Sequence, residues 1–120
     1  MTWRIDARVP VSVTDTLPPL TAGTALLAEG ALPPDLPPDL PAAVFARTAE
    51  GEQAAHPAAC LCCRGQGAAA AALAALFRAR ATGGPWFDRV VALVRTPAGR
   101  AEVEEALTRD ILTLARYRRA

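Results

Sequence analysis

Short apolar runs and helical patterns alternate along this chain of 120 residues. Runs typical of strands lie at residues 8–13, 43–47 and 87–95, and the last contains the uninterrupted apolar stretch 90–94, as in strands buried on both faces of a parallel sheet. Strands that alternate with helices favour a parallel sheet with helices packed on it. We therefore predict an α/β class: a small three-layer fold whose short, mostly parallel sheet of about three strands is flanked by helices.

Two of the predicted helices lie before the last strand. Residues 20–30 are expected to form a weak helix, because a threonine stands near their start and a glycine at their end. The clearest helix is predicted over residues 67–80, where large apolar residues recur three and four positions apart. The residues of this helix expected to share one face are Leu73, Leu76 and Phe77.

A third helix is predicted from Thr96-Pro97, a capping signal, to about Arg118. Glutamates near its start and arginines near its end suit the helix dipole. We expect Tyr117 to belong to a solvated helix end, and Glu102, Glu104 and Glu105 to form an exposed face. The residues expected to face the core are Val103, Ala106, Leu107, Ile111 and Leu114.

Prolines limit what two other segments can do. Pro10 has no N–H to donate, so the first strand is expected at a sheet edge or to place this residue at its beginning. The tandem repeat Pro-Pro-Asp-Leu at 33–36 and 37–40 predicts an extended connector over residues 31–41 that adds nothing to the core. We interpret residues 1–120 as a single domain that contains this connector.

Composition narrows the classes of function. Hydrophobic residues make up 52% of the chain, but many are alanines, so a thin core is expected; Trp3 and Trp86 are expected to pack. The net charge is +1 without a basic stripe, so nucleic acid is not expected as a partner. No apolar stretch is long enough to cross a membrane, no signal peptide is recognised, and the cysteines are not spaced as a disulfide framework. A cytoplasmic protein without a membrane partner is therefore expected.

The chemical feature of the chain is the cluster Cys60-Leu61-Cys62-Cys63. The dipole of the following helix and the neighbouring arginine are expected to lower the pKa of these thiols, and thiolates bind metals. Soft sulfur ligands suit zinc, cobalt or copper(I) and exclude magnesium and calcium. Zinc prefers four ligands, so His56, water or a donor from another chain would complete the shell. We predict a metal site at Cys60, Cys62 and Cys63 with His56 as the candidate fourth ligand.

Several motifs resemble those of the CobW-type GTPases, the P-loop family of metallochaperones. The carriers of this resemblance are the Cys-x-Cys-Cys cluster, the alanine-rich helix after it and the strand Phe87-Asp88-Arg89-Val90-Val91, in the family's order. The resemblance covers roughly residues 57–118 and is faint before them. It implies a degenerate P-loop NTPase-like fold and a role in metal handling, with a full-length CobW-type GTPase or a metalloenzyme client as the implied partner.

The chain departs from this family where nucleotide would be bound. The family's phosphate loop ends in Gly-Lys-Thr-Thr, whereas the corresponding stretch 14–24 has two prolines without N–H groups, and Ala22 stands at the lysine position. The acid that should end the strand at 90–94 is missing. The base-reading Asn-Lys-x-Asp motif is also missing, because the chain has neither asparagine nor lysine. We therefore expect a pseudo-GTPase that neither binds nor hydrolyses nucleotide, and no catalytic residues.

Alternatives to metal binding stay open at the sequence level. The thiols can instead carry out disulfide exchange, or they can be a relic without function, and His56 can be an ordinary loop residue. A broken nucleotide-binding domain can also act as an interaction module that docks on an intact GTPase or its client. Its docking surface would be the sheet edge or the predicted helix over 103–114.

Overall fold

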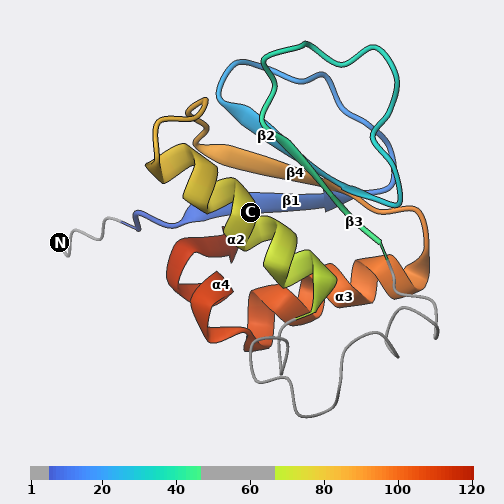
Figure 1. The fold of residues 1–120 in the computed structure, drawn as a ribbon. Coiled ribbons are helices and arrows are strands. Elements are labelled where there is room, and N and C mark those ends of the chain that lie inside the picture. Colours follow the sequence, from blue (N-terminus) through green and yellow to red (C-terminus); the bar gives the residue numbers. More distant parts are fainter. Residues whose placement is uncertain (1–5, 47–66) are drawn as a thin grey trace, which may run out of the picture.

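A parallel β-sheet forms the centre of the computed structural model, which describes residues 6–46 and 67–120 (Figure 1). The five strands lie in the order β3-β2-β4-β1-β5, and every pairing between them is parallel. The strands are β1 (Val9–Thr14), β2 (Thr24–Glu29), β3 (Ala42–Phe45), β4 (Arg89–Leu93) and β5 (Tyr117–Arg119). The helices are α2 (Ala68–Ala81), α3 (Pro97–Arg109) and α4 (Ile111–Arg116).

The predicted α/β class with a parallel sheet is confirmed, and the strands predicted at 8–13, 43–47 and 87–95 correspond to β1, β3 and β4. The predicted number of strands is too low, because β2 and β5 were not expected. Pro10 lies at the beginning of β1, where it is paired with Arg118 of β5 but precedes the first residue pair between β1 and β4, so its missing N–H does not interrupt the β1–β4 ladder. That position lets β1 lie inside the sheet, between β4 and β5.

The helix predicted at 20–30 is wrong, because this segment contains β2. Helix-forming residue types such as alanine and leucine dominate β2, yet all six residues from Thr24 to Glu29 are buried between β3 and β4. Gly23 and Gly30, with φ of 83° and 84°, adopt the left-handed conformation on either side of the strand. The glycine interpreted as a helix end is therefore a turn residue after a strand, and tertiary burial overrides local propensity.

The continuous helix predicted up to Arg118 is also wrong. α3 ends at Arg109, and Asp110 adopts extended backbone and caps the short helix α4, accepting hydrogen bonds from Thr113 N (2.9 Å) and Thr113 Oγ1 (2.7 Å). The chain then turns into β5 at the sheet edge, where Tyr117 is fully buried rather than solvated. Of the expected inward residues, Val103, Ala106 and Leu107 are buried, Leu114 is half-buried, and Ile111 is 82% exposed.

Helices cover only one face of the sheet in the described part of the chain, so the predicted three-layer arrangement is not seen there (Figure 1). The opposite face, at Leu26, Val91 and Leu93, is covered by the connections after β1 and β2. Leu36 and Leu40 of the proline repeat pack on this face. The connector over 31–41 has no helix or strand, as expected, but it does contribute to a small core of its own.

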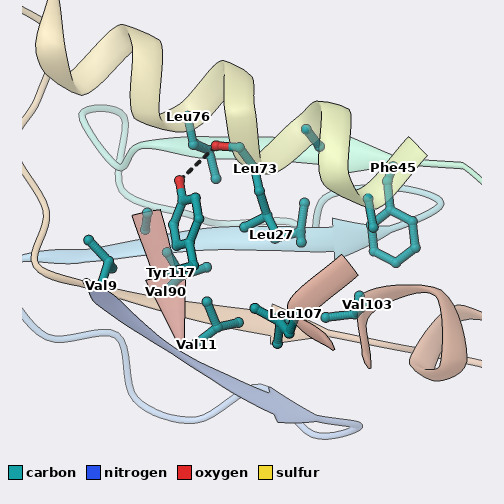
Figure 2. Close-up of a cluster of buried hydrophobic side chains, with 14 of the residues drawn as sticks. Val9, Val11, Leu27, Phe45, Leu73, Leu76, Val90, Val103, Leu107 and Tyr117 are labelled. Carbon is teal, nitrogen blue, oxygen red and sulfur yellow. Dashed lines mark hydrogen bonds between the residues drawn. The ribbon is translucent and has the colours of Figure 1, made fainter. Parts of the chain in front are cut away.

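The main core lies between the sheet and the helices (Figure 2). Leu27 and Val90 from the strands meet Leu73 of α2 and Leu107 of α3, and small alanines on α2 let that helix lie close to the sheet. Tyr117 extends under α2, where its hydroxyl donates a 2.7 Å hydrogen bond to the Leu73 carbonyl. A buried phenol whose polar end is satisfied fixes β5 against α2. No described helix combines the length and the hydropathy that a membrane crossing requires.

Candidate functional site

The four predicted metal ligands, Cys60, Cys62, Cys63 and His56, lie in the segment 47–66, outside the described residues. The structure therefore defines only the two places where this segment joins the fold. On one side the chain leaves β3 after Phe45, at the carboxyl end of a parallel strand. On the other side it returns at Gly67, the N-cap of α2. Ligand-binding residues of open α/β sheets commonly gather at the carboxyl ends of the strands.

The N-terminus of α2 carries a partial positive charge that no side chain of its own neutralises. Gly67 has extended backbone (φ −77°, ψ 170°) and no side chain with which to cap the helix, and the first turn contains no acidic residue. The N–H groups of a first helical turn have no partner within the helix, so they favour a negative group placed before it. A thiolate in the preceding segment is such a group.

A hollow of about 340 Å³ lies beside this helix end. Acidic residues predominate among the charged residues of its lining, which contains three carboxylates and one guanidinium. A Cβ atom on Gly67 would lie 3.6 Å from Glu102 Oε1, so the start of α2 and the middle of α3 are in contact. The charged residues of the hollow are Glu102, Glu105, Arg109 and Asp110.

On α3, the prediction that three glutamates form an exposed face is correct for Glu105 and only partly correct for Glu102 and Glu104. Glu102 is half-buried beside Gly67, and Glu104 is half-buried and paired with Arg119 at 3.0 Å. Within residues 6–46 and 67–120, no group of three histidine, cysteine, aspartate or glutamate residues is placed to hold a metal ion. The described carboxylates alone therefore do not form a metal centre.

The stretch that corresponds to the phosphate loop of the resembled family has a different geometry. Residues 15–23 leave the carboxyl end of β1 and lead into β2, not into a helix. The Arg89 guanidinium donates to Thr21 Oγ1 (2.9 Å), the Ala22 carbonyl (3.1 Å) and Thr24 Oγ1 (3.3 Å). An arginine of β4 thus binds the backbone at Ala22, the residue that stands at the family's lysine position. This is not the strand–loop–helix geometry with which a phosphate loop presents its N–H groups.

The N-terminus of α3 is already occupied by a carboxylate of the protein. Glu29, the last residue of β2, is buried and accepts hydrogen bonds from Arg95 N (2.6 Å), Thr96 N (3.0 Å) and Thr96 Oγ1 (2.6 Å). The Thr96 hydroxyl oxygen in turn accepts from Gly99 N at 2.9 Å, as the predicted capping signal requires. A Cβ atom on Gly99 would overlap the Glu29 carboxylate. This helix end therefore leaves no room for an external anion.

Sequence reasoning missed Glu29 because its segment was interpreted as a helix. An acid that ends a buried strand, with a Thr-Pro helix start at the end of a neighbouring strand, is the signal that would have identified this contact. Comparison with protein-family models, with curated proteins and with solved structures found no significant match. The resemblance to CobW-type GTPases therefore rests on the motifs quoted from the sequence.

Proposed function

We propose that this chain is a metal-binding accessory protein, a pseudo-GTPase that binds zinc through Cys60, Cys62 and Cys63, with His56 as a candidate fourth ligand. Cobalt and copper(I) are the alternative metals. The observation that carries the proposal is the clustering of three thiols a few residues before the start of α2, whose N-cap, Gly67, has no side chain of its own to cap the helix. Packing alone does not require three cysteines within four positions, whereas three thiolates that lie close together suit a soft metal ion.

The electrostatics at the start of α2 support two steps of this proposal. The helix dipole favours thiolate over thiol in the residues before Gly67, which is the form that binds metal. The excess of carboxylates around the adjoining hollow attracts cations to the same place. A shell of three sulfurs and one exchangeable ligand suits a protein that passes its metal to a client rather than one that stores it.

Metal stoichiometry tests the proposal directly. Protein purified from zinc-supplemented medium is expected to contain about one zinc ion per chain. Cys62→Ser is expected to lose most of this zinc, because only two of the three sulfur ligands then remain. Ser12→Ala, a change in β1 far along the sequence, is the control variant. A metal content below about a tenth of an equivalent, or equal content in both variants, would remove the proposal.

The same protein preparations distinguish metal binding from thiol–disulfide exchange and from nucleotide hydrolysis. Thiol–disulfide exchange would give metal-free protein a measurable reduction potential at Cys60 and Cys62 and a thiol that titrates well below its usual range. Nucleotide hydrolysis is not expected, because residues 15–23 lead into a strand and the start of α3 is filled by Glu29. Turnover of GTP by pure protein would contradict this expectation.

One observation favours a second candidate function, that of an interaction module. Ile111 and Leu112, adjacent residues at the start of α4, are 82% and 54% exposed, although the sequence pattern predicted the first of them to be buried. Contiguous exposed apolar side chains are a common feature of surfaces that bind partner proteins. A full-length CobW-type GTPase or its metalloenzyme client is the proposed partner.

Co-purification distinguishes this role from metal carriage. A complex with the GTPase that survives replacement of all three cysteines by serine, but is lost in Ile111→Ser/Leu112→Ser, would assign binding to α4. A complex lost with the cysteines and retained in the α4 variant would instead tie the partner to the metal.

A further inference from the structure

Four arginines from separate parts of the chain line one depression at the amino ends of β1 and β4. The depression has a volume of about 460 Å³, and two aspartates also line it. Its side chains therefore carry an excess of positive charge, opposite in sign to the hollow at the start of α2. The arginines are Arg8, Arg80, Arg89 and Arg118, and the acids are Asp6 and Asp88.

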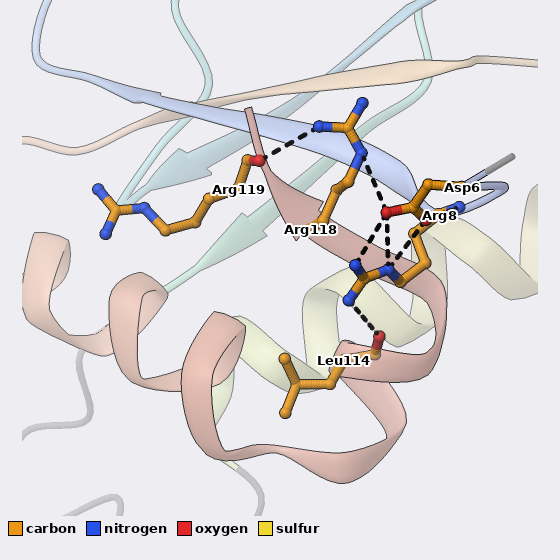
Figure 3. Close-up of polar contacts among 5 residues, drawn as sticks. All are labelled: Asp6, Arg8, Leu114, Arg118 and Arg119. Carbon is orange, nitrogen blue, oxygen red and sulfur yellow. Dashed lines mark hydrogen bonds and ion pairs between the residues drawn. The ribbon is translucent and has the colours of Figure 1, made fainter. Parts of the chain in front are cut away.

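Two of these arginines are fixed by the contacts shown in Figure 3. The Arg8 guanidinium donates to both oxygens of Asp6, at 3.0 Å from Nε and 2.8 Å from Nη2, and to the Leu114 carbonyl at 3.4 Å. Arg118 Nε lies 3.7 Å from the same carboxylate, and its Nη1 donates to the Arg119 carbonyl at 3.3 Å. One aspartate thus holds two guanidiniums together, which leaves this group positively charged.

Arg80 has no acidic partner among the described residues. Its guanidinium lies over the ring of Trp86, 3.7 Å from the centroid, and 5.3 Å from the centroids of Phe77 and Phe87. Its Nε is buried without a hydrogen-bond partner in the described part of the chain. Cation–π contacts with three rings fix the position of this charge without neutralising it. A guanidinium that is fixed in position and has no carboxylate partner is well suited to bind a phosphate group.

We propose that this arginine-lined depression binds a small phosphate monoester. Arg80 is the main contact, and Arg8 and Arg118 lie beside it. Guanidiniums match the phosphate group because each offers paired donors, and several of them balance its two negative charges. The site lies at the C-terminal end of α2, whereas the cysteine segment joins its N-terminal end. It is therefore distinct from the proposed metal site and does not depend on it.

Trp86 supplies the signal for a binding experiment. Trp86 is 64% exposed and its ring is in contact with Arg80, so a phosphate drawn to the guanidinium is expected to change the tryptophan fluorescence. The probes are inorganic phosphate and glycerol 3-phosphate, titrated at constant ionic strength in a Trp3→Phe background. Saturable binding is expected for both, and chloride at the same ionic strength is expected to give none.

Two variants locate the site. Arg80→Gln is expected to weaken phosphate binding by about tenfold or more, the effect of losing one charge-assisted contact. Arg78→Gln, in the same turn of α2 but outside the depression, is the matched control and is expected to bind as the parent does. Because Arg80 also packs on aromatic rings, isothermal titration calorimetry of Arg118→Gln provides a second test if Arg80→Gln does not fold.

Three results would overturn the assignment of a phosphate monoester to this depression. The first is equal affinity in Arg78→Gln and Arg118→Gln, and the second is the lack of a saturable signal with millimolar phosphate. The third is a single-stranded oligonucleotide that binds more tightly than glycerol 3-phosphate and is weakened by Arg80→Gln, because the natural ligand would then be a nucleic acid backbone.

Discussion

Glu29 and Tyr117 are buried polar residues with defined partners, and both were misinterpreted in the sequence for the same reason. Each was assigned to a helix, whereas each belongs to a strand whose neighbours are far away in the chain. A helical pattern depends on residues three and four positions apart and contains no information about these contacts. The Glu29 carboxylate contacts Thr96, and the Tyr117 hydroxyl contacts Leu73.

Glu29→Gln is expected to destabilise the fold by about 1–3 kcal/mol, because a carboxylate that accepts charge-assisted hydrogen bonds becomes an amide with only one acceptor oxygen. The two backbone N–H groups at the start of α3 and the Thr96 hydroxyl then compete for that oxygen. Urea denaturation measures the change. Glu105→Gln on the exposed side of α3 is the control, and an equal effect of both substitutions would contradict the role given to Glu29.

The folded protein is expected to lose stability at alkaline pH because the phenol of Tyr117 is buried. Burial raises the pKa of its phenol well above the ordinary value near 10, and nearby Arg80 and Arg116 oppose this only in part. Above about pH 10 the unfolded chain therefore releases a proton that the folded chain retains, so stability falls as pH rises, by up to about 1.4 kcal/mol per pH unit. The chain contains one tyrosine and no lysine, so this loss is assigned to Tyr117.

Denaturation midpoints between pH 9 and 12 check this expectation, in a background without cysteines so that thiol ionisation does not contribute. Tyr117→Phe is expected to make the profile nearly flat, while at neutral pH it costs about 1 kcal/mol for the lost hydrogen bond to Leu73. A profile that falls equally in Tyr117→Phe would show that another group is responsible.

At the scale of elements, those with strong local patterns were predicted and those defined by their neighbours were not. The apolar run of β4 and the alanine-rich α2 were located within one or two residues of their limits. β2 has helix-forming residue types, and only its position between two strands makes it extended. The arginine depression was not predicted either, because its residues lie between positions 6 and 120 and meet only through the sheet order. Cys60, Cys62, Cys63 and His56 remain a prediction.

Asp110 decides where the predicted third helix stops. Its carboxylate accepts from the backbone and the hydroxyl of Thr113, which starts α4 and directs the chain toward β5. Asp110→Ala is expected to cost about 1 kcal/mol, the usual loss of an N-cap. Thermal unfolding measures this cost, with Asp39→Ala on the exposed connector as the control. An unchanged midpoint would mean that the packing of α4, not its cap, fixes the break.

For the whole molecule, the charges separate along α2 although the net charge is only +1. Carboxylates predominate at the hollow beside Gly67, and guanidiniums predominate at the depression beside Arg80. The 14 residues of α2 extend over about 20 Å at the usual helical rise. This exceeds the screening length of about 8 Å at physiological ionic strength. The two proposed ligands should therefore hardly influence each other through their charges.

Zinc and phosphate are accordingly expected to bind independently. The dissociation constant for glycerol 3-phosphate should agree within about twofold between zinc-loaded protein and protein treated with a chelator, because direct coupling across that distance is screened. Calorimetry on both forms, and on Cys62→Ser, measures this. A change of tenfold or more would mean that α2 and the sheet transmit a conformational change between its two ends. Metal loading would then control phosphate binding, and by linkage phosphate would alter the affinity for zinc by the same factor.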